Sequence, residues 1–241
     1  LFLLRYWKIT KHPYSLKMVT TTLKQMRQGG IFDHIGFGFH RYATDRTWKI
    51  PHFEKMLYDQ ALLLNIYIEA YQATQNNVFK QTAEEIITYT IRDLTSSKAG
   101  FYAAEDADSQ GKEGKFYTWT YEELSTILSP DELTIASIVY SIKKEGNVHL
   151  DEKRTNENIL YQSMSLKEAA TVLNLSIKNL TKKLSIIRKK LFNIRSQRTH
   201  PGKDDQILTD WNGLMIASLA KAARTFNEPK YLRIAEQAIT F

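Results

Sequence analysis

The sequence predicts an all-α protein in which helical hairpins stand side by side in a ring, an α/α toroid. Three observations lead to this prediction. Apolar residues recur at helical spacing along most of the chain, sustained apolar–polar alternation is rare, and a buried helix followed by an amphipathic one occurs twice. With 241 residues, 43% of them hydrophobic and 24% charged, the chain has the length and composition of one large globular domain.

The first helix pair follows Pro51. Residues 52–74 are apolar nearly all round, as in a buried helix, whereas residues 78–95 keep their apolar side chains on one face. Residues 208–226 and 227–241 repeat this pair. An offset of 152 matches Leu62 with Leu214, Phe79 with Tyr231 and Ala83 with Ala235. Since this offset accommodates about three hairpins of roughly 50 residues, we expect a ring whose inner-helix N-termini surround one cavity.

The region between the two copies contains further helix starts. Thr120, Ser129 and Ser165 each precede a glutamate by three positions, which is the spacing of a capping box. Residues 141–162 lack a periodic apolar face and are predicted to form a loop or an irregular ribbon.

Positive charge is concentrated in residues 162–203, which carry ten Lys or Arg and one acidic residue in a chain of net charge +7. Their apolar residues recur at helical spacing. This predicts an amphipathic helix whose basic residues, Arg195 and Arg198 included, form a solvated face. A surface for nucleic acid or another polyanion is the less favoured alternative.

The composition excludes several classes of site and location. The chain has no cysteine, so disulfides, thiolate zinc sites and cysteine nucleophiles are excluded. No apolar run reaches the roughly 20 residues that span a bilayer, and no signal peptide is recognisable, so we expect a cytoplasmic protein without a membrane partner. The histidines lack zinc-site spacing, and we expect neither a metal nor another cofactor. The absence of an initiator methionine and the end on an apolar helix face suggest a fragment of a longer protein.

The first candidate site is the glycine-rich segment 29–60, which combines histidines, charges and aromatic rings. On a helix that begins at residue 52, His52, Lys55 and Asp59 share one face at spacings i, i+3 and i+7. A structural network of buried pairs is the alternative. The candidate residues of this segment are His40, Arg41, Tyr42, His52, Glu54, Lys55 and Asp59.

Two further clusters carry acids and aromatic rings. Glu105, Asp106 and Asp108 are three acids within four residues and precede Trp119, a pattern that suits acid–base catalysis or sugar binding as well as an aromatic core. The third cluster, with candidates Asp204, Asp205, Trp211 and Asn212, precedes the second copy of the buried helix as the histidine cluster precedes the first. Equivalent positions in a ring face the same hole, so we expect the third cluster to share a pocket with His40 and His52.

Three long segments together resemble one known family. They are GGIFDHIGFGFHRYATDRTWKIPHFEKMLYDQALL, GFYAAEDADSQGKEGKFYTW and KDDQILTDWNGLMIASLA. In order and spacing they resemble the YyaL and spermatogenesis-associated thioredoxin-domain family over residues 13–241, with Phe37 where that family more often has glycine. The resemblance implies a thioredoxin-like domain followed by an (α/α)6 toroid similar to N-acylglucosamine 2-epimerases and six-hairpin glycosidases. Residues 1–241 are then part of the toroid, without the thioredoxin-like domain and the last hairpins.

The leading functional hypothesis is a carbohydrate-active toroid that binds a small-molecule sugar. In an epimerase version, His40 or His52 removes a proton beside a carbonyl and Arg41 stabilises the enolate oxygen. In a glycosidase version, two carboxylates supply acid and base, with Trp211 or Tyr42 stacked on the sugar, and the carboxylates are drawn from Asp59, Glu105, Asp106, Asp204 and Asp205. The alternative is a non-catalytic binding module that works with a thioredoxin-like domain of the same protein in a redox or protein-quality role.

Overall fold

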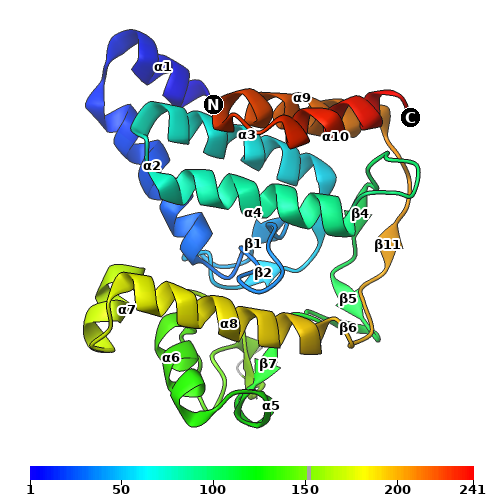
Figure 1. Ribbon diagram of the computed structural model, residues 1–241. Coiled ribbons are helices and arrows are strands. Elements are labelled where there is room, and N and C mark those ends of the chain that lie inside the picture. Colours follow the sequence, from blue (N-terminus) through cyan, green and yellow to red (C-terminus); the bar gives the residue numbers. More distant parts are fainter. Residues whose placement is uncertain (151–152) are drawn as a thin grey trace.

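The computed structural model describes residues 1–150 and 153–241, and it confirms the predicted, mostly helical class (Figure 1). The helices fall into two layers. The upper layer in Figure 1 contains α1 (Phe2–Thr10), α2 (Pro13–Gln28), α3 (Leu57–Thr74), α4 (Asn77–Asp93), α9 (Thr209–Phe226) and α10 (Pro229–Ile239). The lower layer contains α5 (Tyr121–Ile127), α6 (Pro130–Tyr140), α7 (Leu166–Val172) and α8 (Ile177–Arg195).

The strands are short, and each covers two residues. They are β1 (Tyr42–Ala43), β2 (Pro51–His52), β3 (Lys55–Met56), β4 (Ala104–Glu105), β5 (Asp108–Ser109), β6 (Lys112–Glu113), β7 (Trp119–Thr120), β8 (His149–Leu150), β9 (Lys153–Arg154), β10 (Glu157–Asn158) and β11 (Lys203–Asp204). A loop or an irregular ribbon was predicted for residues 141–162, of which 151 and 152 lie outside the described residues, and the pairings β8–β9 and β7–β10 agree with it. Ser129 and Ser165 form the predicted capping boxes.

The internal repeat is confirmed by the helix boundaries. Both α3 and α9 have 18 residues, and they begin 152 positions apart. They pack along each other in parallel, since Ser218 Oγ donates to the Ala61 carbonyl and Gln72 donates to Thr225. The outer helices α4 and α10 pack on α3 and α9 respectively. Two hairpins therefore stand side by side with parallel inner helices, as neighbouring units of an α/α toroid do.

One prediction about the ring is wrong. The offset of 152 was expected to leave intervening hairpins between the two copies, but α3 contacts α9 directly. The chain between them leaves the ring and forms the lower layer. In that layer, α5 and α7 have only seven residues each, and α8 buries Leu180, Leu184 and Ile187 against α6 and α7.

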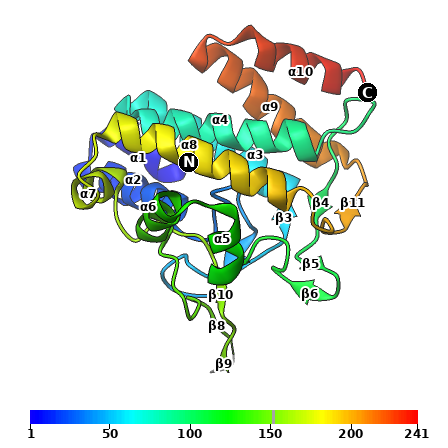
Figure 2. The same cartoon turned by 60° about the horizontal axis from the view of Figure 1, so that its bottom comes forward.

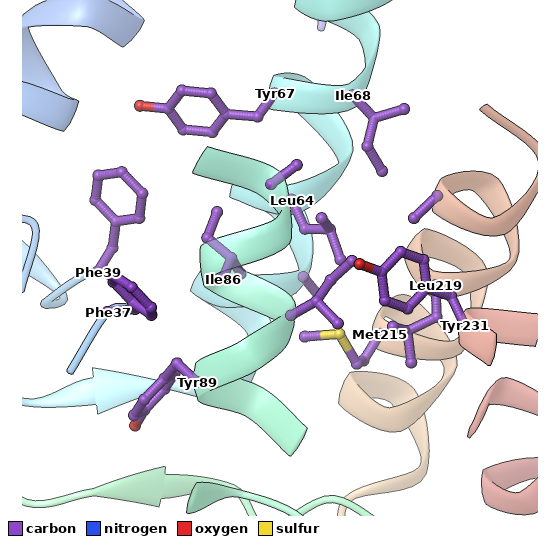
Figure 3. Close-up of a cluster of buried hydrophobic side chains, with 14 of the residues drawn as sticks. Phe37, Phe39, Leu64, Tyr67, Ile68, Ile86, Tyr89, Met215, Leu219 and Tyr231 are labelled. Atoms are coloured by element: carbon purple, nitrogen blue, oxygen red, sulfur yellow. The ribbon is translucent and has the colours of Figure 1, made fainter. Parts of the chain in front are cut away.

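The main core lies around α3, which is buried on most sides (Figure 3). The Tyr67 ring packs on Phe39 at a centroid distance of 5.7 Å, and its hydroxyl donates to the Leu23 carbonyl at 2.7 Å. The Gln60 side chain accepts from the Phe39 amide and donates to the Phe39 carbonyl. These contacts fix the glycine-rich segment against the first turns of α3. No helix in the described part of the chain has the length and apolar composition needed to cross a bilayer.

Leu64 and Leu62 form a matched pair for testing the orientation of α3. Leu64 is fully buried, whereas Leu62 is 45% exposed. Leu64→Ala should lower the free energy of unfolding by about 2–5 kcal/mol because it leaves a cavity in the core. Leu62→Ala should change it by less than about 1 kcal/mol. Urea unfolding followed by circular dichroism measures both, and equal losses would contradict the packing of α3.

Candidate functional site

The three sequence clusters meet in one small sheet. Strands β3, β4 and β11 pair antiparallel, which places Lys55 opposite Glu105 and Glu105 opposite Lys203. Each strand comes from a different cluster, and β3 leads directly into α3. Figure 2 shows the three strands together near the start of α3 and α9. The sheet therefore joins segments that lie about 150 residues apart in the sequence.

The predicted helix face of His52, Lys55 and Asp59 is wrong. Helix α3 begins only at Leu57, and the residues before it are extended and paired in strands. Successive side chains of an extended chain point to opposite sides. His52 and Glu54 accordingly lie half-buried on one side, whereas Phe53 and Lys55 are buried on the other.

This alternation separates the polar residues into two groups. The first, here called the open cluster, reaches the surface and consists of Arg41, Tyr42, His52, Glu54, Tyr58, Asp59 and Trp211. The second, here called the buried charge cluster, lies beneath it and consists of Asp33, Lys55, Tyr89, Glu105, Tyr117 and Arg195.

Asp33 is the centre of the buried charge cluster. Its two carboxylate oxygens accept from Arg195 Nη1 and Nη2, both at 2.8 Å, and Oδ2 also accepts from Lys55 Nζ at 2.8 Å. Burial by itself raises the pKa of Asp33, but the charges of Arg195 and Lys55 outweigh that effect and hold this pKa well below its ordinary value. Arg195 is only 3% exposed, so its predicted place on a solvated face is wrong.

The remaining polar groups of this cluster surround a cavity of about 30 Å³, the volume share of about one water molecule. The Tyr89 hydroxyl donates to Glu105 Oε2 at 2.7 Å. Among the described residues, neither the buried Tyr117 hydroxyl nor Arg195 Nε has a hydrogen-bond partner. The buried charge cluster thus has a small polar cavity and, among the described residues, two hydrogen-bond donors without an acceptor.

His40 lies behind the surface, not in a solvent-facing pocket. It is 2% exposed, its Nδ1 lies 2.9 Å from the Phe53 carbonyl, and its ring meets Phe53 and Tyr117 edge to face. Burial lowers the pKa of His40 to about 3, and the nearby Lys55 charge acts in the same direction. The imidazole is therefore neutral at physiological pH and cannot touch a ligand at the surface.

The open cluster is held together by ion pairs and ring contacts. Arg41 donates to Glu54 Oε2 at 2.8 Å and to the Tyr58 hydroxyl at 3.1 Å. His52 Nδ1 lies 2.7 Å from Glu113 Oε1, and Nε2 lies 3.5 Å from Glu54 Oε2. Tyr42 stacks on the His52 ring at a centroid distance of 4.9 Å. The arrangement presents a guanidinium, an imidazole and a carboxylate side by side.

Asp59 is the most perturbed group of the open cluster. It lies in the first turn of α3, and among the described residues its buried Oδ2 has no hydrogen-bond partner. Burial raises the pKa of Asp59 to about 6, with Arg41 lowering it and Glu54 raising it. Trp211, from the first turn of α9, meets the Tyr58 ring at 4.8 Å and so borders the same surface. A carboxyl group with such a pKa can exchange a proton near neutral pH.

The other predicted site residues lie elsewhere. Trp119 is buried in the lower core, with the Arg198 guanidinium over its ring. Asn212 Oδ1 accepts from the Phe101 amide at 2.8 Å, and Asn212 Nδ2 donates to the Phe101 carbonyl at 2.9 Å. Four predicted acids, Asp106, Asp108, Asp204 and Asp205, are exposed, and among the described residues none of their side chains forms a hydrogen bond or ion pair with the open cluster. Within the described residues, no three His, Asp or Glu side chains converge as ligands for a metal ion.

Sequence reasoning missed Asp33, Tyr58, Tyr89, Tyr117 and the burial of Arg195. Arg195 did carry a usable signal, because it continues the apolar stripe of Leu184, Ile187 and Leu191 at helical spacing. Asp33 begins the glycine-rich turn, and its Oδ1 accepts from the amides of Ile35 and Gly36 at 3.0 Å. The tyrosines had no comparable signal, since their roles depend on contacts distant in sequence.

Comparison with known proteins identifies relatives of the chain. No family model matches it. It is 35% identical to spermatogenesis-associated protein 20 of Homo sapiens and of Mus musculus over 263 aligned residues, and 37% identical to an uncharacterized protein of Caenorhabditis elegans over 247. These alignments include 100%, 100% and 94% of the chain but 34%, 33% and 34% of the relatives. The chain therefore spans about a third of the length of the curated relatives it matches, and the predicted family resemblance is confirmed.

Solved structures give a weaker likeness. A cellobiose 2-epimerase from Bacillus thermoamylovorans aligns with 99% of this chain and 72% of its own, at 12% identity and a TM-score of 0.40. A D-mannose isomerase aligns with 92% of this chain and 49% of its own, at 14% identity and a TM-score of 0.32.

The Asp33 ion pairs should dominate the stability of the site. Asp33→Asn leaves two buried cations without their carboxylate and should lower the free energy of unfolding at pH 7 by about 3–5 kcal/mol. The exposed Asp205→Asn should change it by less than about 0.5 kcal/mol. Because the folded pKa of Asp33 is depressed, the difference from wild type should persist from pH 7 down to about pH 5 and shrink only in stronger acid. Denaturant titrations at several pH values measure it.

Asp59 should produce the opposite pH dependence. A carboxyl group whose pKa is raised from 3.8 to about 6 binds its proton more tightly in the folded state, so it reduces stability as the pH rises through that interval. Asp59→Asn removes this effect. The unfolding free energy of the variant relative to wild type should therefore increase between about pH 4 and pH 6 and then level off. A pH-independent difference between Asp59→Asn and wild type would contradict the raised pKa.

Proposed function

The chain is a homologue of part of spermatogenesis-associated protein 20, and we propose that its open cluster binds a sugar and exchanges a proton with it. The observation that carries the proposal is the environment of Asp59. A half-buried carboxyl group with a pKa of about 6 lies beside Arg41 and Glu54, at the start of two parallel helices. Such a pKa keeps both protonation states populated near neutral pH.

The side chains of the open cluster suit a polyhydroxylated ligand. Glu54 and Asp59 offer carboxylate oxygens to sugar hydroxyls, and Arg41 offers planar donors. Tyr42 is 49% exposed, and Trp211 is partly exposed beside Tyr58. Aromatic faces at the edge of such a polar group favour the apolar face of a sugar ring.

The geometry favours proton transfer next to a carbonyl over the other versions. His52, unlike His40, reaches the surface and is oriented by Glu54 and Glu113. It can remove the proton, Arg41 can stabilise the enolate oxygen, and Asp59 can return a proton. For hydrolysis, the carboxylate pair would be Asp59 and Glu54, because the side chains of Asp106, Asp204 and Asp205 form no hydrogen bond or ion pair with the open cluster in the part of the chain that the structure describes.

An exchange experiment in deuterated buffer tests this function. The chain is incubated with mannose, glucose, cellobiose and N-acetylglucosamine, and NMR follows deuterium at the carbon beside the carbonyl. Asp59→Asn should reduce incorporation by about 10²–10⁴-fold, because it removes the acid–base group. The matched variant Asp205→Asn should leave it unchanged.

The remaining outcomes are equally decisive. Release of monosaccharide from cellobiose without deuterium incorporation would mean that the reaction is hydrolysis and not proton transfer beside a carbonyl. Saturable binding of a sugar with neither reaction would favour the non-catalytic module that works with a thioredoxin-like domain. Neither binding nor turnover of any sugar would overturn the proposal.

A further inference from the structure

A cleft of about 210 Å³ lies between the two layers of the fold, and no residue of the open cluster lines it. Helices α2 and α4 form one side, and α6 and α8 form the other (Figure 1). We propose that this cleft binds a small anion that carries a carboxylate or phosphate group, with the Arg188 guanidinium as its anchor. The residues that carry the argument are Arg27, His34, Glu85, Tyr140, Gln162 and Arg188.

The charges of the cleft leave one cation without a carboxylate. Glu85 Oε2 accepts from Arg27 Nη2 at 2.8 Å, and its Oε1 accepts from Gln81 at 2.9 Å, so both oxygens are engaged. Arg188 lies 4.6 Å over the Phe37 ring and, in the part of the chain that the structure describes, forms no ion pair. Two cations and one acid give the lining a net positive charge, which attracts anions.

His34 lines the cleft and is 4% exposed. Its Nε2 lies 3.0 Å from the Gly29 carbonyl and its Nδ1 lies 3.2 Å from Arg27 Nη1. Because a carbonyl can only accept, Nε2 carries the proton and Nδ1 accepts from Arg27. Burial lowers the pKa of His34 to about 3, so this arrangement persists at physiological pH. Arg27 is thereby held by His34 and Glu85 together.

Neutral donors complete the lining. Tyr140 is buried, and burial raises its pKa to about 12 against the lowering effect of Arg27 and Arg188, so its hydroxyl is protonated at neutral pH. Gln162 and Ser185 add an amide and a hydroxyl. The cleft is several times the roughly 30 Å³ that one water molecule occupies. It therefore has room for a small carboxylate or phosphate ester, whose oxygens accept from these donors.

The test is a titration of the chain with inorganic phosphate and with citrate at constant ionic strength, followed by heteronuclear NMR. Saturable shifts are expected at the amides of Arg188, Ser185 and Gln162. Arg188→Leu should weaken binding by about 10–100-fold, the usual contribution of hydrogen bonds to a charged group. Tyr140→Phe should weaken it by about 3–10-fold.

Lys189→Leu is the matched control, because Lys189 neighbours Arg188 on α8 but is exposed outside the cleft. It should leave binding within about twofold of wild type, since an exposed charge contributes little. Saturation by phosphate alone or by citrate alone supports the site and identifies the preferred anion. If Arg188→Leu and Lys189→Leu weaken anion binding equally, the binding comes from the general positive charge of α8 and not from this cleft. That result would overturn the proposal. If neither probe binds saturably, the proposal is overturned as well. If Arg188→Leu does not fold, the expected loss of affinity in Tyr140→Phe still tests the site.

Discussion

The ion pairs of Asp33 with Lys55 and Arg195 are the constraint on which the rest of the structure depends. They join the glycine-rich segment, the strand before α3 and the end of α8, and so connect the upper layer to the lower one. The close approach of Arg195 also explains Gly36, since a Cβ at that position would lie 2.1 Å from Arg195 Nη2. Breaking such a pair leaves uncompensated charge in the interior, which is far more costly than losing a surface ion pair.

The buried charge cluster also determines where the open cluster lies. Because Lys55 is bound to Asp33 and paired in the sheet, the alternation of the extended chain directs His52 and Glu54 to the opposite side. Phe37 has a φ of 70°, in the left-handed region that favours glycine. The hydrogen bonds of Phe39 to Gln60 hold the segment in this shape.

The sequence predicted the parts of the fold that periodicity encodes. The equivalence of Leu62 with Leu214 is borne out by their exposures of 45% and 39%, and that of Phe79 with Tyr231 by their burial. Periodicity carries no information about which helices become neighbours, so the direct contact of α3 with α9 could not be predicted. The helix start at His52 was wrong because the partners of β3 come from residues 104 and 105, far along the chain. Arg195 was wrongly predicted to lie on the solvated face because of its charge. Its position on the stripe of Leu184, Ile187 and Leu191 indicates that it is buried.

Proton affinity decides which of the ionisable groups can do chemistry. Asp33 stays ionised because two cations hold it, and its oxygens are fully engaged. His40, with a pKa of about 3, is protonated in about one molecule in ten thousand at pH 7. Asp59, with a pKa of about 6, is protonated in about one molecule in ten and reaches the surface. Of these three groups, only Asp59 can therefore both accept and return a proton at neutral pH, which is why the proposed acid–base chemistry is assigned to the open cluster and a structural role to the buried charge cluster.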